Sequence, residues 1–318
     1  MFAPAQDPKP PVSPDDQGFK LSVAVSQVFL SVTARSYEGG FYKGLAREDF
    51  QVFEDGVEQE ILNFAHEAVP VSVVLLIDAS GSTRDIQSSI RRAALSFAKS
   101  LGNEDQLSII QFNHEPRLIL EWTNDLERVQ LALERIYPKE RTFMYDALFV
   151  TFDDLLEGVS GKKAVILLTD GVDTGSEITD NEVLDLAVRS EALVYVASKL
   201  KEYWAGAIQT RSQFFRLGRP VPAAFSDDYI LQSKRALDRL ANTTGGRVLE
   251  AEAFSNLTQV YQEVADELKN QYYISYIPIN RATDGRWREL EVRAKRTGVS
   301  VKTRAGYYAA GASPPETP

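Results

Sequence analysis

The sequence predicts a doubly wound α/β domain with a mostly parallel sheet, inserted into a β-sandwich built from the N- and C-terminal segments. Between residues 69 and 270, nearly continuous apolar segments alternate with amphipathic helical ones, as expected for parallel strands covered on both faces. In residues 18–68 and 271–309, apolar and polar residues alternate with a period of two, which is typical of half-buried strands. These flanking segments are only about 50 and 40 residues long, near the lower limit for an independent core. We therefore expect them to share one sandwich, the alternative being two small β appendages that dock separately.

The N-terminal segment, residues 1–17, is rich in proline and charge and shows no apolar periodicity. This composition predicts an extended, disordered linker. Ala3-Pro4-Ala5 has the small-x-small form of a signal-peptidase site, so the segment is either a signal-peptide remnant or an ordinary disordered tail. We favour the first interpretation, which predicts an exported protein located in the periplasm, at the cell surface or outside the cell.

The order of the predicted elements follows from the apolar pattern. Asp55-Gly56 lies between two short strands and predicts a hairpin turn. In the central domain, strands separated by helical segments or short turns are predicted at 71–78, 106–112, 117–122, 163–170, 192–198 and 247–251. Alternation then returns at 271–278, 288–296 and 299–304, before a tail at 310–318.

The composition excludes several kinds of partner and of metal site. The net charge of −10 argues against nucleic acid, because binding to a phosphate backbone needs a concentrated basic face. Cysteine is absent, and neither His66 nor His114 has a second ligand at zinc-like spacing. Any metal must therefore bind to oxygen atoms. The longest apolar run, residues 71–77, is far shorter than the ~18 residues of a membrane span.

The first candidate ligands, Asp78, Ser80 and Ser82, directly follow the apolar strand 71–77. They are expected at the carboxyl end of a parallel strand, the edge where open α/β sheets bind ligands. Side chains two residues apart in an extended segment point the same way, and Gly81 lets the backbone turn. Converging hydroxyl and carboxylate oxygens suit a hard divalent cation. The serines could equally cap the next helix without any metal.

Two further residues are expected at the same edge of the sheet. Thr142 precedes a helical segment, and Asp170 follows the apolar strand 163–169. Helix capping by the serines does not explain either residue. The sequence therefore predicts a divalent metal site formed by Asp78, Ser80, Ser82, Thr142 and Asp170.

Three segments of this site resemble a known family. DASGS at 78–82, TFMYDAL at 142–148 and LLTDG at 167–171 are similar to the metal-ion-dependent adhesion site of von Willebrand factor A domains, which include integrin ligand-binding domains. The resemblance covers residues 69–270. It implies hydroxyl ligands at Ser80, Ser82 and Thr142, and carboxylates that bind directly or through water at Asp78 and Asp170.

Other segments extend this resemblance, and one departs from it. LANTTGG at 240–246 resembles the helix-to-strand turn of the family, while DFQVFEDG at 49–56 and RAGYYA at 304–309 resemble bacterial von Willebrand factor A-related proteins. Where the family usually has small glycines before the threonine, this chain has Lys-Glu-Arg at 139–141, which leaves the loop shape open. We interpret Asp173 as a turn or capping residue.

The charges of the site indicate its partner. Asp78 and Asp170 neutralise a divalent ion and the hydroxyl ligands add no charge, so an open coordination position attracts a carboxylate. The positive end of the helix after Ser82 favours an anion further. We therefore expect a protein partner that offers an aspartate or glutamate. Arg84 and Arg141 either flank it or are ordinary solvated charges.

The segment 199–233 is much longer than the usual connection between a strand and a helix. It should emerge at the metal edge, where basic residues stand beside aromatic ones, with Tyr203 and Trp204 as candidate contacts for the partner. We interpret it either as a lid that sets specificity or as an appended helix that packs its aromatic side chains on the domain.

The combined expectation is metal-dependent protein binding without turnover, by an exported bacterial adhesion-type protein. Mg²⁺ is the expected cofactor, with Mn²⁺ or Ca²⁺ as alternatives. A metal-dependent hydrolase is the competing function, but DASGS lacks a second aspartate two residues after the first and the chain lacks a phosphate-cradling glycine loop. A third possibility is a structural envelope component with a vestigial site.

Overall fold

The computed structural model describes residues 27–66, 69–139, 141–250 and 256–311. At its centre is a six-stranded sheet with the strand order β10-β9-β8-β5-β6-β7. Neighbouring strands are parallel except for the antiparallel pair β6 and β7, which confirms the mostly parallel sheet. The strands are β5 (Val71–Asp78), β6 (Gln106–Phe112), β7 (Pro116–Thr123), β8 (Lys162–Thr169), β9 (Leu193–Ser198) and β10 (Val248–Glu250).

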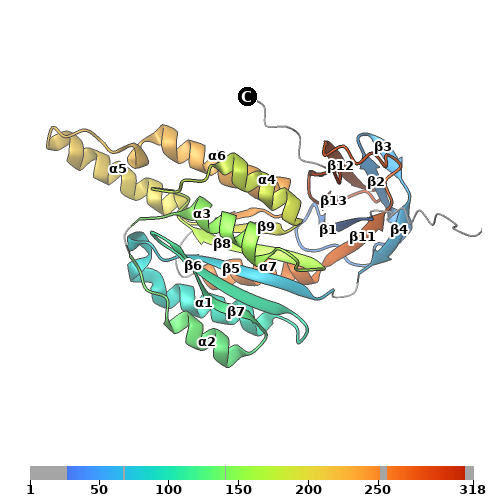
Figure 1. The fold of residues 1–318 in the computed structure, drawn as a ribbon, viewed down its shortest axis with the longest axis horizontal. Helices are drawn as coiled ribbons and strands as arrows, with labels where there is room; N and C mark the ends of the chain where they lie inside the picture. Colours follow the sequence, from blue (N-terminus) through green and yellow to red (C-terminus); the bar gives the residue numbers. More distant parts are fainter. Residues whose placement is uncertain (1–26, 67–68, 140, 251–255, 312–318) are drawn as a thin grey trace, which may run out of the picture.

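Helices cover both faces of this sheet (Figure 1). Val73, Leu75 and Ile77 of β5 are buried in the cluster that includes one set of helices, and Val74 and Leu76 in the cluster of the other set. This alternation explains why β5 reads as a continuous apolar run. The first set is α1 (Gln87–Ser100), α2 (Leu126–Glu134) and α7 (Leu257–Lys269), and the second is α3 (Met144–Val150), α4 (Asp180–Ser190) and α6 (Asp227–Thr243).

The two ends of the chain form the predicted sandwich together. Its two four-stranded sheets have the orders β13-β1-β11-β4 and β14-β12-β2-β3, so each sheet combines strands from both ends, and the idea of separate appendages is wrong. Figure 1 shows the blue and red strands packed side by side. The strands are β1 (Val28–Ser36), β2 (Phe50–Glu54), β3 (Val57–Gln59), β4 (Ile61–Ala65), β11 (Gln271–Tyr276), β12 (Trp287–Ala294), β13 (Val299–Lys302) and β14 (Gly306–Tyr308).

Several local expectations can be compared with the structure. Asp55 and Gly56 form the turn between β2 and β3, both with positive φ, as a two-residue hairpin requires.

The segment 199–233 is mainly helical: it contains α5 (Leu200–Arg216) and the start of α6. The linker and signal-peptide predictions for residues 1–17, the start of the predicted sandwich segment at 18–26 and most of the tail fall outside the described residues. Among the helices that the structure describes, none is long and apolar enough to cross a membrane.

A buried ion cluster joins the sandwich to the α/β domain. Glu267 on α7 is 1% exposed, and one of its carboxylate oxygens accepts hydrogen bonds from Arg35 on β1 and from Arg247, both at 2.8 Å. Thr33 and Tyr195 donate to the other oxygen at 3.4 and 3.2 Å. Because α7 leads directly into β11, this cluster fixes the angle at which the sandwich meets the amino-terminal end of the sheet.

Replacing Glu267 by glutamine should destabilise the protein by roughly 3 kcal/mol, because Arg35 loses its counter-ion and Arg247 keeps only Glu263, at 3.4 Å. Urea denaturation followed by circular dichroism measures the loss. Glu291→Gln is the matched control, since Glu291 pairs with Arg293 on the exposed surface and such pairs contribute little. Equal midpoints for wild type and Glu267→Gln would contradict the role assigned to this cluster.

Candidate metal centre

The candidate ligands gather where the parallel strands end. Strands β5 and β8 pair in a register that puts Ile77 opposite Leu168. Asp78 therefore ends β5 beside Thr169, and Asp170 comes immediately after β8. The order of these residues along two neighbouring strands is what brings the two carboxylates together.

The loop that carries Thr142 is tied to both of these segments by its backbone. The Lys139 N–H donates to the Ala79 carbonyl at 2.9 Å, next to Asp78. On the other side, the Thr174 N–H donates to the Thr142 carbonyl at 2.8 Å, and the Thr142 N–H donates to the Thr174 hydroxyl at 2.9 Å. Thr142 is 5% exposed. It is thus held between the loop after β5 and the loop after β8.

Asp78 is the most constrained of the candidate ligands. It has no exposed surface and accepts hydrogen bonds from the Ser80 N–H at 2.8 Å and from the Thr169 hydroxyl at 3.4 Å. Burial, followed by repulsion from Asp170, raises the pKa of Asp78 to about 7, although the Ser80 hydroxyl and the positive charge of Lys199 oppose that rise. A cation at this place would relieve the repulsion.

The capping explanation for the serines is not what the structure shows for Ser80. It precedes the short 3-10 helix Gly81–Ile86, yet its side chain makes no capping hydrogen bond there, and it bonds to Asp78 instead. Thr83 donates its hydroxyl to the Ser80 carbonyl at 2.8 Å. The side chain of Ser82 lies outside the described part of the chain, so its place in the ligand set stays a prediction.

The backbone conformation of Arg141 explains how this chain can have Lys-Glu-Arg at 139–141 where the family usually has glycines. Arg141 adopts a φ of +74°, in the left-handed region that glycine occupies without steric cost and other residues rarely enter. The backbone before Thr142 therefore follows a path suited to glycine even though an arginine stands there. Arg141 and Arg84 are both exposed, and their contact with a partner stays a prediction.

Asp173 has a structural role, as expected, but for a helix earlier in the chain. Its carboxylate accepts the Met144 N–H at 2.8 Å at the start of α3, and the N–H groups of Gly175 and Ser176 at 3.1 and 2.9 Å in its own turn. It thereby fixes the helix that follows Thr142 against the loop that follows Asp170.

Sequence reasoning missed two residues of this site. Thr169 is completely buried and donates to Asp78. Lys199, the first residue of the segment 199–233, is 3% exposed, and its N–H donates to the Thr169 carbonyl at 3.0 Å. The rule that selected Asp170, that a polar residue at the end of an apolar strand faces the site, would also have selected Lys199 after β9.

The two aromatic residues proposed as partner contacts pack within the protein. Tyr203 stacks on Phe225 with ring centroids 5.9 Å apart and donates its hydroxyl to the Ala224 carbonyl at 3.2 Å. Trp204 donates Nε1–H to Asp227 at 3.0 Å. These contacts match the alternative of an appended helix that packs its own aromatic residues, although both side chains stay half-exposed and their contact with a partner stays a prediction.

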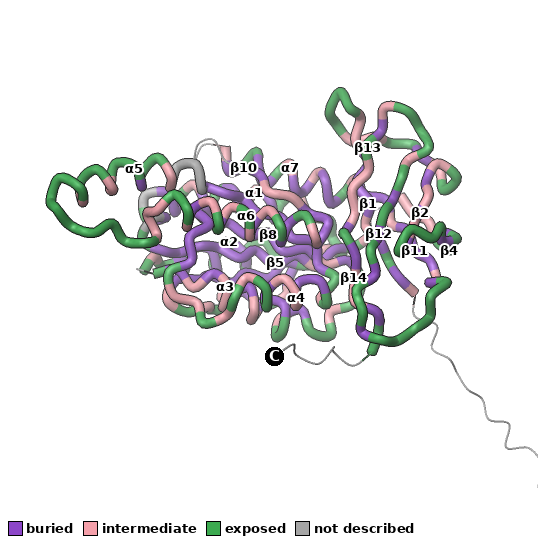
Figure 2. Tube along the Cα trace, turned by 90° about the horizontal axis from the view of Figure 1, so that it is seen from above, coloured by how far each residue is buried: buried purple, intermediate pink, exposed green. Residues whose placement is uncertain are grey.

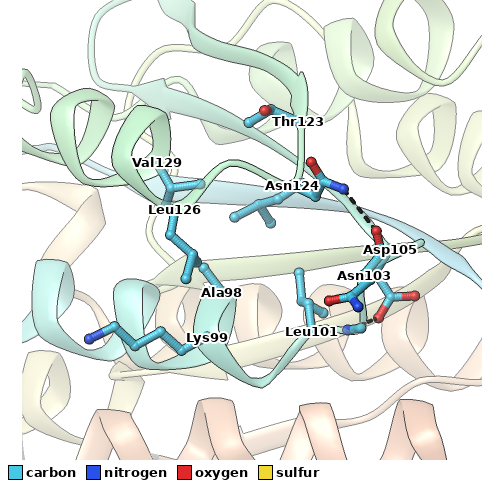
Figure 3. A pocket seen from close by; sticks show the side chains of 11 residues that line it. Ala98, Lys99, Leu101, Asn103, Asp105, Thr123, Asn124, Leu126 and Val129 are labelled. Carbon is cyan, nitrogen blue, oxygen red and sulfur yellow. Dashed lines mark hydrogen bonds between the residues drawn. The ribbon is translucent and has the colours of Figure 1, made fainter.

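A cavity of about 360 Å³ lies at the other end of the sheet, between α1, α2 and the start of β6 (Figure 3). Two of the polar side chains that line it, Asp105 and Asn124, already form hydrogen bonds within the protein. The Asp105 carboxylate accepts the Gly102 N–H at 2.6 Å and the Val71 N–H at 2.9 Å, and the Asn124 amide donates to the Asn103 carbonyl at 2.8 Å. These bonds hold the connections around the amino-terminal edge in place and do not converge on the cavity.

Comparison with known proteins identifies the domain that contains these residues. Residues 73–172, which include Asp78, Ser80, Thr142 and Asp170, match the family model of the von Willebrand factor type A domain. The chain contains a von Willebrand factor A domain. It is also 27% identical over 220 residues to inter-alpha-trypsin inhibitor heavy chain H4 of Sus scrofa. That match covers 63% of this chain but only 21% of the relative.

Solved structures of this domain type are also similar. The von Willebrand factor domain of the type V pili tip protein Mfa5 from Porphyromonas gingivalis is 22% identical, with 35% of this chain and 43% of that chain covered and a TM-score of 0.32. Proximal thread matrix protein 1 from the mussel byssus is 12% identical, with 75% and 50% covered and a TM-score of 0.47. A second structure of that mussel protein, 16% identical with 63% and 48% covered and a TM-score of 0.45, has a zinc-occupied metal-ion-dependent adhesion site (MIDAS) motif.

The shifted pKa of Asp78 predicts how stability depends on pH without metal. Folding raises this pKa from 3.8 to about 7, so between these values the folded state keeps a proton that the unfolded state releases. The metal-free protein should therefore lose stability as the pH rises through this interval. Melting temperatures in chelator measure the loss, and Asp78→Asn should flatten it. A variant whose melting temperature falls as steeply as that of wild type would contradict this prediction.

Proposed function

We propose that the von Willebrand factor A domain of this protein binds a divalent cation and uses it to hold an acidic side chain of a protein partner. This domain family is known for metal-dependent protein binding or adhesion. The observation that carries the proposal is the buried carboxylate pair, Asp78 and Asp170, at the carboxyl edge of the sheet. The proposed ligands are Asp78, Ser80, Ser82, Thr142 and Asp170.

The donor set fits a hard cation. Two carboxylates and neutral hydroxyl oxygens match the preference of Mg²⁺ for oxygen ligands, and Mn²⁺ and Ca²⁺ are the alternatives. When bound, the cation supplies a Lewis-acidic position that takes a carboxylate from the partner. Asp78 and Asp170 cancel the two charges of the ion, and the ammonium of Lys199 adds one positive charge to the site. The site as a whole would then attract an anion.

We also propose that the protein binds its partner without turnover and acts outside the cytoplasm. The first part is supported by the structural uses already found for the remaining acidic residues near the site. Asp173 holds α3 and its own turn, and Asp146 accepts the N–H groups of Glu177 and Ile178 at 3.0 and 3.2 Å. The second part is supported by the Ala3-Pro4-Ala5 motif alone.

Thermal melting with Mg²⁺ or Mn²⁺ against chelator tests the metal site. At a metal concentration about a hundredfold above Kd, binding stabilises the folded state by about 2.7 kcal/mol, which corresponds to a rise of roughly 5–10 °C in Tm. Asp78→Ala should abolish this rise, because it removes a ligand charge that the serine and threonine hydroxyls cannot replace.

Asp154→Ala, at an exposed acidic position on another face, is the matched control and should keep the full shift. If the wild-type protein melts at the same temperature with metal and with chelator, the proposed metal site is wrong. Hydrolysis of phosphate esters or carboxylic esters that needs Mg²⁺ and disappears in Asp170→Ala would show that the site is catalytic.

A further inference from the structure

A helical hairpin is built onto the loop that follows Asp170. We define the α5 hairpin as residues 200–230, which comprise α5, the connection and the first turn of α6. Its base contributes Ala207 and Ile230 to a buried cluster with Val172, two residues after Asp170. The Tyr229 hydroxyl also donates to the Asp173 carbonyl. The base of the hairpin is therefore fixed to the candidate metal loop.

The outer part of this hairpin exposes large apolar side chains. Phe215 is 85% exposed, Leu217 68%, Ile208 52% and Val221 39%. Figure 2 shows this part of the chain as an exposed projection at the end of the molecule farthest from the sandwich. Ile208 and Phe215 are seven residues apart on α5, so they lie on one face of the helix. Exposed apolar side chains are thus present both at the tip and halfway along α5.

The tip has a defined conformation. Gly218 has a φ of +62°, and the Arg219 N–H closes the turn by donating to the Phe214 carbonyl at 3.0 Å. Pro220 and Pro222 then restrict the returning chain. The apolar side chains are thus presented by a closed turn, which reduces the ordering cost of binding.

The outer part of the hairpin is basic, whereas Glu202, Asp227 and Asp228 at its base reduce the net charge of residues 200–230 to +1. Residues 203–226 contain three arginines and no acidic residue, whereas the whole chain has a net charge of −10. Arg211 is used internally, because it pairs with Asp227 at 2.7 Å. Arg216 and Arg219 are exposed, and neither forms an ion pair within the described ranges.

We propose that the tip of the α5 hairpin is a second contact for the partner held at the metal. It binds a partner segment in which aliphatic or aromatic side chains stand beside acidic ones. Arginine and aromatic side chains are enriched at protein interfaces, and an acidic segment complements Arg216 and Arg219. The inference rests on the proposed function, because two contacts on one partner strengthen each other only if the metal site is the first.

The position of the apolar surface favours a protein over a membrane. An anionic membrane would also complement arginines and apolar side chains, but it would meet the tip alone. Ile208 lies nearer than Phe215 to the start of α5, and this helix begins directly after Lys199, which is buried beside the metal edge. An extended protein segment can follow that path and still reach the metal.

A random-peptide library tests this surface. Peptides are selected on the full-length wild-type protein in Mg²⁺ and eluted with chelator, and each is then measured by fluorescence polarisation against variants. The selected peptides should combine acidic with aliphatic or aromatic residues. Phe215→Ser with Leu217→Ser, and separately Arg216→Ser with Arg219→Ser, should each weaken binding at least about tenfold while the metal-induced melting shift stays intact.

The matched control is Leu118→Ser with Leu131→Ser, which removes side chains that are 49% and 56% exposed outside the hairpin, and it should bind as wild type does. Equal binding by wild type and both hairpin variants would overturn the inference while leaving the metal site standing. A library from which chelator releases no bound peptide, or selected peptides that bind Asp78→Ala as tightly as wild type, would instead refute the proposed function.

Two other outcomes would also overturn the inference. One is metal-independent binding to vesicles of phosphatidylcholine and phosphatidylglycerol, absent with phosphatidylcholine alone, that Phe215→Ser with Leu217→Ser abolishes. The other is a dimer, seen by light scattering, that the same variant dissociates.

Discussion

Asp78 is cut off from solvent and lies close enough to Asp170 for the two carboxylates to repel each other. A buried charge is costly unless hydrogen bonds or an opposite charge compensate it. Three groups around Asp78 partly compensate its charge. Ser80 and Thr169 donate hydrogen bonds to it, and Lys199 contributes a positive charge. They do not restore the ordinary pKa, and the remaining imbalance is what a divalent cation would correct.

A second buried carboxylate, Glu267, shows the opposite arrangement. Two arginines and two hydroxyl groups satisfy it, and it joins the sandwich to the amino-terminal end of the sheet. Glu267, whose charge is compensated, thus stabilises the junction between the two domains. Asp78 and Asp170, whose charges are only partly compensated, lie at the opposite end of the same sheet. The sandwich sits at the far end (Figure 1), so it does not cover the carboxyl edge of the sheet.

The α5 hairpin adds a second set of side chains near the carboxyl edge of the sheet. The metal would recognise a single carboxylate, which many proteins can offer, so it provides little discrimination by itself. The hairpin adds arginines and apolar side chains on a base held by Val172 and Ile230. Specificity would then come from the residues that flank the partner's carboxylate. The apolar contacts between the hairpin and the partner would be less sensitive to salt than purely ionic contacts.

The sequence by itself determined the architecture, and all five proposed ligands were chosen from it. Continuous apolar strands, amphipathic helices and the polar residues that follow each strand, such as Asp78 and Asp170, are local patterns, and a parallel sheet brings them to one edge. Only the tertiary structure decided that Arg141 adopts a glycine-like conformation, that Lys199 is buried beside the site, and that Tyr203 and Trp204 pack inside a hairpin whose exposed tip is Phe215 and Leu217. Each of these depends on contacts between segments far apart in the chain, and local periodicity carries no information about such contacts.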